Sequence, residues 1–319
     1  MADNITLKNK KILLTGGKGF LGSYVYEKLL RRGVDKADIT LTTSKNDDLR
    51  DKKACERAIR GHEVVIHCAG RIGGIKYTLE HPGEVFYDNA MMGLNIIEGA
   101  RKAKVEKLTF VGTACEYPRN VGIPYVEEEL WNGYPDKINA TYGLSKRFAL
   151  VQGQAYREEY GLNSTHLLLA NLYGPNDDFS LGYSHVIAAL IRKAIEAVER
   201  GEKELEVWGT GKASREFLYV EDAADAIVLA TERYNKSDPV NVGNGKEVSI
   251  KELVNMISEM TGFKGTIRWD TSKPDGQPRR CLEVSKAKKE FGFRAKTGMR
   301  NGLKKTIGWY SGHKHQYHD

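Results

Sequence analysis

Short apolar runs alternate with longer segments of helical periodicity through the first half of the chain. A short strand followed by a longer helix, repeated, is the pattern of βαβ units, which build a parallel sheet with helices on both faces. The predicted strands are Lys11–Thr15, Ile39–Thr43, Val64–Cys68, Lys107–Val111 and His166–Ala170. The predicted helices between them are Gly22–Arg32, Lys52–Arg60, Asn89–Lys102 and Tyr142–Tyr160. This pattern predicts an α/β fold with a doubly wound parallel sheet.

The alternation weakens after Gly174-Pro175, which predicts a second and smaller α/β domain that binds substrate. The elements expected there are helices at Ser184–Arg200, Glu221–Thr231, Lys251–Thr261 and Ser285–Phe291, a strand at Leu205–Trp208, and a charged loop at Lys273–Arg280. We assign residues 1–174 and 216–243 to the larger domain, and residues 175–215 and 244–319 to the smaller one. Because ligands of open α/β sheets bind beyond the carboxyl ends of the strands, we expect a cleft between the two domains.

The composition is that of a globular protein. The chain has 319 residues, of which 40% are hydrophobic and 29% charged, enough for about two domain cores. Its apolar runs are far shorter than the ~20 residues that a membrane span needs, so we expect no membrane association. The N-terminus lacks the apolar stretch of a signal peptide, which favours a cytoplasmic location. The four cysteines lie far apart without a CxxC pair, so we expect free thiols and no metal site.

The chain is basic, with 49 Lys and Arg against 42 Asp and Glu and a net charge of +7. A positive field favours anionic partners, either phosphorylated small molecules or nucleic acid. The basic residues are interspersed with acidic ones and form no stripe with aromatic residues, so we expect no nucleic-acid interface. The histidine-containing tail His313–His318 could bind a metal loosely, but a disordered terminus is the expected structure.

A glycine-rich turn directly follows the first predicted strand. Glycines at this spacing allow a tight turn, close approach of backbone N–H groups to a pyrophosphate, and close packing of the next helix. A plain tight turn is the alternative, but the strand before it and the helix after it favour a dinucleotide site in a Rossmann fold. The predicted contacts are Gly16, Gly17, Lys18, Gly19, Phe20, Leu21 and Gly22.

The end of the second predicted strand favours NADP over NAD. An NAD site usually has an acidic residue there to bind the ribose hydroxyls. This chain instead has Thr42, Ser44 and Lys45, with Lys18 in the glycine turn, which suits a 2′-phosphate. A charge-assisted contact to phosphate is worth about 1.5 to 3 kcal/mol, enough for roughly tenfold preference. Asp48 either accepts from the adenine amino group or is a solvated loop residue.

A tyrosine and a lysine four residues apart open the helix at residues 142–160. Tyr142 and Lys146 share one helical face, so the ammonium can lower the pKa of the phenol. Thr113, at the end of the fourth predicted strand, can hydrogen-bond the same carbonyl oxygen. A surface tyrosine beside a solvated lysine is the alternative. The combination with the glycine turn favours a site that donates a proton during hydride transfer.

These motifs resemble the extended short-chain dehydrogenase/reductase family, whose members modify nucleotide sugars. Three further stretches are similar to its GDP-L-fucose synthase branch, which epimerises and reduces GDP-4-keto-6-deoxy-D-mannose. They are residues 67–75, residues 112–118, and residues 171–175 followed by 184–187. The similarity runs from about residue 10 to about residue 310. Thr113 stands where the family commonly has Ser, and Ala114 replaces a small polar residue. The acidic pair of the dehydratases is absent, so dehydration is disfavoured.

The resemblance implies roles for a thiol and an imidazole. A ketone at C4 acidifies the hydrogens on C3 and C5, so a base and an acid on opposite sides of the ring could invert both centres. By similarity Cys115 is the base and His185 the acid, and acid–base catalysis contributes about 10² to 10⁴ in rate. NADPH then reduces C4 while Tyr142 donates the proton. From the residues alone, a buried small thiol and a core or capping histidine remain alternatives.

The resemblance also implies the remaining contacts. The expected cofactor contacts are Val111, Gly112, Thr113, Ala114, Tyr142, Lys146, Leu169, Ala170, Asn171, Leu172 and His185. The expected substrate contacts are Trp208 at the guanine, Lys193 and Arg215 at the diphosphate, and Asp275 near the nucleotide. For two of these residues there are alternatives: Lys193 could be a solvated surface lysine, and Trp208 could be a core residue. We also expect a homodimer that pairs the helices at residues 89–102 and 142–160 in a four-helix bundle.

Two other functions stay open at this point. One is a 4-reductase or an epimerase that acts on another nucleotide-linked keto-sugar. The other is a scaffold without catalytic activity that senses a dinucleotide or binds RNA. The complete set of Thr113, Tyr142 and Lys146 argues against the scaffold.

Overall fold

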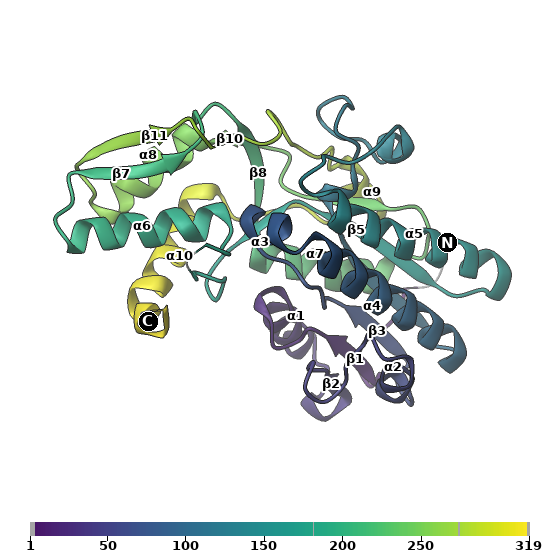
Figure 1. The fold of residues 1–319 in the computed structure, drawn as a ribbon. Coiled ribbons are helices and arrows are strands. Elements are labelled where there is room, and N and C mark those ends of the chain that lie inside the picture. The colour runs from purple at the N-terminus through teal and green to yellow at the C-terminus, as the bar shows by residue number, and fades with distance from the viewer. Residues whose placement is uncertain (1–3, 181, 274, 318–319) are drawn as a thin grey trace.

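The central element is a six-stranded parallel sheet. The computed structural model describes residues 4–180, 182–273 and 275–317, coloured from purple to yellow along the chain in Figure 1. The strand order is β2 (Ile39–Leu41), β1 (Ile12–Thr15), β3 (Val64–His67), β4 (Lys107–Thr113), β5 (Ser164–Leu169) and β9 (Val240–Val242). Every neighbouring pair in this sheet is parallel. The predicted doubly wound α/β fold is therefore confirmed.

Alternate residues of the strands face two separate hydrophobic cores. Ile12 and Leu14 of β1 pack in one core with α1 (Phe20–Arg31) and α7 (Val220–Arg233). Leu13 packs in the other core with residues of three helices on the opposite face: α2 (Lys52–Ile59), α4 (Pro82–Ala103) and α5 (Ala140–Tyr160). Burial on both faces is why these strands read as continuous apolar runs in the sequence.

Helix α4 begins seven residues before the predicted start at Asn89. Pro82 occupies the first turn, where its missing N–H costs nothing, and Glu84 adds favourable charge to the same turn. The short helix α3 (Ile75–Glu80) was not predicted. Its apolar residues Ile75 and Leu79 are exposed, so the helix has no buried stripe that periodicity could reveal.

A smaller unit is formed mostly by segments from the second half of the chain. It contains a three-stranded sheet in the order β10 (Glu247–Ser249), β8 (Ser214–Tyr219) and β6 (Asn171–Tyr173). A separate two-stranded sheet pairs β11 (Thr266–Asp270) with β7 (Glu204–Trp208). Helices α6 (Val186–Glu199), α8 (Ile250–Thr261) and α10 (Met299–His313) pack with these strands in a third core. Helix α9 (Ser285–Phe291) instead packs against α7 and β9. The strands β6, β8, β9, β10 and β11 and the helix α10 were not predicted. Strands β6, β9 and β10 have three residues each, β11 is partly exposed, and β8 begins with three polar residues.

The expectation of a disordered tail was wrong for residues 313–317. His313 ends α10, and residues Lys314–Tyr317 form the 3₁₀ turn η4. The Tyr317 ring lies 5.7 Å from that of Phe179, and its hydroxyl donates to the Asp177 carbonyl at 3.1 Å. These contacts hold the turn against the smaller unit. His318 lies outside the described residues.

A large cavity lies at the carboxyl edge of the six-stranded sheet. Its volume is about 1030 Å³, and its lining comes both from loops after β1, β3 and β4 and from α6, β7 and β8. It occupies the place where a cleft between two units was expected. Within the described ranges, no helix is long and apolar enough to cross a bilayer.

Replacing Ile66 by Ala tests the packing of the central sheet. The side chain of Ile66 is fully buried in the core, so Ile66→Ala should lower the free energy of unfolding by about 2 to 5 kcal/mol. Urea denaturation followed by circular dichroism measures the change. Leu79→Ala is the control, because Leu79 is 56% exposed and its loss should cost less than ~0.5 kcal/mol. Equal losses would contradict this assignment of the core.

Candidate active site

The glycine turn between β1 and α1 forms one end of the cavity. Gly16 has φ +68°, which L side chains rarely adopt, and a Cβ on Gly22 would lie 2.0 Å from the Gly16 carbonyl oxygen. Helix α1 therefore starts tightly against the turn, with its free N–H groups at the cavity. Gly17 does not line the cavity, and a Cβ there would meet the Leu41 side chain. The turn fits the pyrophosphate of a dinucleotide.

Thr42, Ser44 and Asp48 line the cavity next to this turn, whereas Lys45 does not. Arg50, which the sequence analysis missed, lies in the same wall. Its Nε and Nη2 donate to the two Asp48 oxygens at 2.9 and 2.7 Å. The hydrogen bond from Arg50 lowers the pKa of Asp48. Asp48 is thus an ionised acceptor already bonded to a cation.

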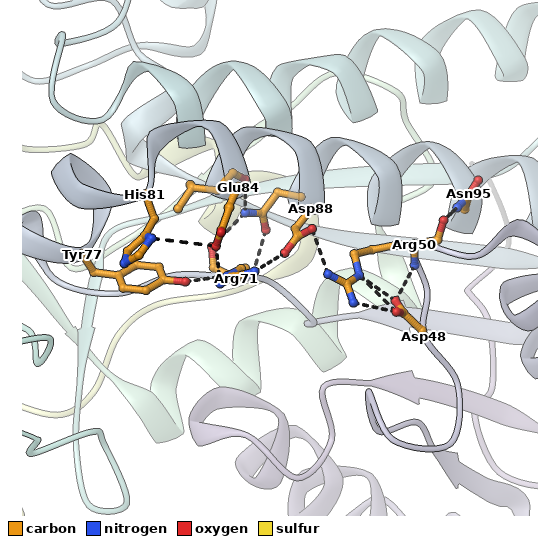
Figure 2. A network of polar contacts seen from close by, with 10 residues as sticks. Asp48, Arg50, Arg71, Tyr77, His81, Glu84, Asp88 and Asn95 are labelled. Atoms are coloured by element: carbon orange, nitrogen blue, oxygen red, sulfur yellow. Dashed lines mark hydrogen bonds and ion pairs between the residues drawn. The ribbon is translucent and has the colours of Figure 1, made fainter.

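A polar network fixes the cavity wall formed by α4, as Figure 2 shows. Arg50 and Arg71 donate to opposite oxygens of the buried Asp88, at 3.1 and 2.6 Å. Asn89 accepts from the backbone N–H of Arg71 at 3.0 Å and donates to its carbonyl at 2.8 Å. Arg71 also pairs with Glu84 at 2.6 Å. The segment after β3 is therefore held to α4 by both backbone and side-chain bonds.

Tyr142 and Lys146 occupy adjacent positions on the cavity side of α5. The Lys146 Nζ lies 5.8 Å from the centre of the Tyr142 ring. Burial lowers the pKa of Lys146 to about 8, although Glu116 and Cys68 oppose the shift. Burial also raises the pKa of Tyr142, and Cys115 and Glu116 add to that rise. The expected lowering of the Tyr142 pKa was wrong, because burial, Cys115 and Glu116 all raise it. At neutral pH the phenol holds its proton and can donate it.

Thr113 and Cys115 lie on the turn that ends β4. The turn η2 (Ala114–Glu116) starts with a hydrogen bond from the Cys115 N–H to the Thr113 hydroxyl at 3.2 Å. A Cβ on Gly143 would come within 2.2 Å of the Cys115 carbonyl oxygen, so α5 packs directly on this turn. Ala114 is buried and does not line the cavity. Thr113, Cys115, Tyr142 and Lys146 all do.

A buried arginine contacts the thiol of Cys115. Arg280 donates from Nη1 to the Cys115 Sγ at 3.4 Å and from Nη2 to the Gln277 side chain at 3.0 Å. Its Nε is buried and bonds to no described group. A guanidinium binds an anionic partner more strongly than a neutral one. Sequence reasoning noted the charged loop that contains Arg280 but gave no reason to place it beside Cys115.

His185 lines the same cavity from the N-terminus of α6. Its Nδ1 lies 3.9 Å from the carboxylate of the buried Asp177. Burial disfavours the imidazolium, but Asp177 and Asp178 outweigh that effect and raise the pKa of His185. The imidazole is thus held toward its protonated form, which suits an acid.

The four predicted substrate residues meet at the far side of the cavity. Trp208 is 49% exposed, and the Nζ atoms of Lys193 and Lys273 lie 5.9 and 5.4 Å from its ring centre. Arg215 donates to the carbonyls of Ser214 and Asp275 at 2.7 and 3.2 Å. Burial and the nearby Arg280 lower the pKa of Arg215 to about 10. An exposed indole beside several cations suits a base and a diphosphate.

One cavity therefore collects nearly all of the predicted residues. Those that line it are Gly16, Lys18, Gly19, Phe20, Leu21, Gly22, Thr42, Ser44, Asp48, Val111, Gly112, Thr113, Cys115, Tyr142, Lys146, Leu169, Ala170, Asn171, Leu172, His185, Lys193, Trp208, Arg215 and Asp275. Gly17, Lys45 and Ala114 lie outside its lining. The site combines a dinucleotide cradle, a phenol donor, and a thiol and an imidazole in one enclosed space.

Comparisons with known proteins agree with this geometry. Residues 12–243 match the NAD dependent epimerase/dehydratase family. A GDP-L-fucose synthase of Sinorhizobium fredii is 38% identical over 302 residues, covering 94% of this chain and 95% of that protein. The structure of a GDP-L-fucose synthetase from Naegleria fowleri bound to NADP has a TM-score of 0.88 at 27% identity, over 100% and 99% of the chains. A GDP-6-OMe-4-keto-L-xylo-heptose reductase from C. jejuni has a TM-score of 0.88 at 28% identity, over 97% and 99%.

Asp177→Asn tests the pairing of His185. The amide keeps a similar shape but has no charge, so the pKa of His185 should fall. Titration of the histidine ring by ¹H–¹⁵N NMR measures it. Asp178→Asn is the matched control and should give a smaller fall, because Asp177 pairs with the imidazole at 3.9 Å and Asp178 contributes less to the raised pKa. A pKa that stays constant or rises in Asp177→Asn would contradict the pairing.

Proposed function

We propose that this chain, which belongs to the NAD-dependent epimerase/dehydratase family, converts GDP-4-keto-6-deoxy-D-mannose to GDP-L-fucose. The observation that carries the proposal is the shared cavity. It holds a thiol and an imidazole, Cys115 and His185, together with the set of Thr113, Tyr142 and Lys146. The first pair suits epimerisation next to a ketone, and the second set suits reduction of that ketone.

NADP(H) is the cofactor, and the residues present fit it. The glycine turn and the N-terminus of α1 hold the pyrophosphate, while Lys18, Thr42 and Ser44 provide a cation and hydroxyls for the 2′-phosphate. We assign residues 1–174 and 216–243 to the cofactor domain, and residues 175–215 and 244–319 to the nucleotide-sugar domain. Two elements depart from these bounds: α9 packs against α7 and β9 of the larger unit, and β6 pairs in the sheet of the smaller one. When bound, NADPH supplies the hydride that reduces C4.

Epimerisation needs a base and an acid at C3 and C5. In our proposal the Cys115 thiolate removes the protons of C3 and C5 in turn, and the electron pair of each broken C–H bond moves onto the C4 oxygen as an enolate forms. Between the two steps the thiol returns its proton to solvent and the His185 imidazole takes one up. His185, held toward its imidazolium by Asp177, returns a proton from the other side of the ring. Arg280, 3.4 Å from the sulfur, stabilises negative charge on it.

Reduction needs a proton for the C4 oxygen. Tyr142 donates it, since burial keeps the phenol protonated. Thr113 hydrogen-bonds the same oxygen, and the Lys146 ammonium stabilises the negative charge that the phenol acquires. At the other end, Trp208 stacks on the guanine, Lys193 and Arg215 bind the diphosphate, and Asp275 lies near the nucleotide.

A second candidate is reduction of another GDP-linked keto-sugar without epimerisation. The set of Thr113, Tyr142 and Lys146 is sufficient for that reaction, and the similar C. jejuni protein is a GDP-6-OMe-4-keto-L-xylo-heptose reductase. Isotope exchange separates the two reactions, as described below. The scaffold without catalytic activity is disfavoured because all three reducing residues line the cavity.

We also propose a cytoplasmic homodimer. Helices α4 and α5 expose large apolar side chains, namely Tyr87, Phe148, Val151 and Tyr160. Exposed apolar groups on adjacent helices favour burial against a second copy of the same face. A cytoplasmic location would keep the Cys115 thiol reduced.

Cys115→Ser should abolish epimerisation and spare reduction. A thiol can ionise to the thiolate that acts as the base, whereas a serine hydroxyl stays protonated near neutral pH, so deuterium from D₂O should no longer enter C3 and C5 of GDP-4-keto-6-deoxymannose. NADPH oxidation with a substrate already epimerised should fall less than about tenfold. Proton NMR of the sugar and absorbance at 340 nm measure the two steps. Exchange that survives the substitution would refute Cys115 as the base, and wild-type reduction without exchange would favour the second candidate.

Tyr142→Phe should abolish reduction and spare epimerisation. Without the phenol the C4 oxygen has no donor, so NADPH oxidation should fall by about 10² or more. Deuterium exchange at C3 and C5 should persist, because Cys115 and His185 are unchanged. Tyr134→Phe, at an exposed tyrosine outside the cavity lining, is the control. Loss of exchange together with reduction would show that the two reactions are not separable in this way.

A further inference from the structure

A continuous stack of buried groups joins the Lys146 ammonium to a carboxyl group. The Lys146 Nζ lies 4.9 Å from the centre of the Phe110 ring. The same ring is stacked on His166, with centroids 5.2 Å apart and planes 11° apart. The His166 Nε2 lies 3.0 and 3.1 Å from the two oxygens of Glu116. All four residues are at most 4% exposed.

The same carboxyl group also holds the turn that carries Thr113 and Cys115. One Glu116 oxygen accepts the backbone N–H of Thr113 at 2.9 Å. The Glu116 carbonyl accepts from the Nε of Arg147 on α5 at 2.6 Å. Glu116 therefore contacts the end of β4, β5 through His166, and α5.

The backbone leaves space for this pair. A Cβ on Gly112 would lie 2.3 Å from the His166 Nε2 and 2.4 Å from a Glu116 oxygen. Only glycine fits at this position in β4 while Glu116 and His166 stay where they are. Because an ionised carboxylate only accepts, Nε2 is the donor to Glu116.

The charged and titratable groups around Lys146 are few. Tyr142 lies on the same helix, Cys68 and His67 on the end of β3, and Glu116 on the turn after β4. Burial and the Lys146 charge lower the pKa of His67, so His67 is neutral. Among the groups that raise the pKa of Lys146, Glu116 acts more strongly than Cys68. The negative charge that opposes the burial of Lys146 is thus mainly that of Glu116.

We propose that Glu116 and His166 are positioning residues for the reduction step. The buried carboxylate fixes Thr113 in its turn, and its charge keeps Lys146 an ammonium at the pH where Tyr142 donates its proton. His166 pairs with the carboxylate of Glu116 and holds it in place, and it transmits no proton. The part that concerns catalysis rests on the proposed function, whereas the ionisation of Lys146 can be measured in the free protein.

Glu116→Gln removes the charge and keeps the shape. The amide oxygen can still accept from the Thr113 N–H, so the turn should remain. Competitive acetylation of the free protein with trace acetic anhydride, followed by peptide mass spectrometry, measures the titration midpoint of Lys146. We expect the midpoint to move to lower pH by on the order of one unit. The alkaline limb of NADPH oxidation with GDP-4-keto-6-deoxymannose should move in the same direction, with a proportional loss of kcat at pH 8.

Glu127→Gln is the matched control. Glu127 is also buried, accepts a backbone N–H at 2.9 Å from Asn241, and lies outside the cavity lining. It should leave both readouts unchanged. His166→Phe is the second variant, because its ring can still stack on Phe110. An unpaired buried carboxylate takes up a proton more readily, so the Lys146 midpoint should move in the same direction by less.

The measurements distinguish a failure of this proposal from a failure of the proposed function. A Lys146 midpoint equal to that of wild type in folded Glu116→Gln would overturn the proposal. If Glu116→Gln does not fold, an unchanged or raised midpoint in His166→Phe would overturn it instead. If wild type does not turn over the keto-sugar, the proposed function is wrong, and the acetylation midpoint still decides the role of Glu116.

Discussion

The packing of α5 on the turn after β4 is the contact on which the site depends. Gly143 lets the helix approach the Cys115 carbonyl at a distance that no side chain would allow. That approach places Tyr142 and Lys146 beside Thr113 and Cys115 in one cavity. One short backbone contact therefore positions both the thiol proposed for epimerisation and the phenol and ammonium proposed for reduction. A small shift of α5 would move the phenol, the ammonium and the thiol relative to one another.

Burial then determines what these groups can do. At the cavity wall the ammonium of Lys146 is buried and the phenol of Tyr142 is half-buried. Desolvation favours the neutral form of each, a free amine and a protonated phenol. The buried carboxyl of Glu116 opposes part of this effect, because it raises the pKa of Lys146. Chemistry at this site thus depends on residues behind the cavity wall as well as on those that line it.

The sequence predicted local structure correctly where a single residue type or an uninterrupted apolar run determines that structure. Continuous apolar runs predicted five of the six strands of the central sheet with small errors at their ends, and missed the three-residue strand β9. Glycine spacing predicted the turn at Gly16–Gly22. The positions of Arg50 and Arg280 could not be predicted, because they follow from how distant segments meet. Glu116 and His166 are 50 residues apart, and each alone is an ordinary polar residue in an apolar setting. The helix start at Pro82 and the ordered tail at Tyr317 depend likewise on tertiary contacts that override local pattern.

The ordered tail links the end of the described chain to the imidazole of the site. Tyr317 donates to the Asp177 carbonyl, and the Asp177 carboxylate faces His185. Phe179, next but one in sequence, is sandwiched among the aromatic rings of α10 and η4. Proteolytic trimming or an affinity tag that loosened this last turn would therefore also loosen the segment that holds the Asp177 carboxylate beside the His185 imidazole.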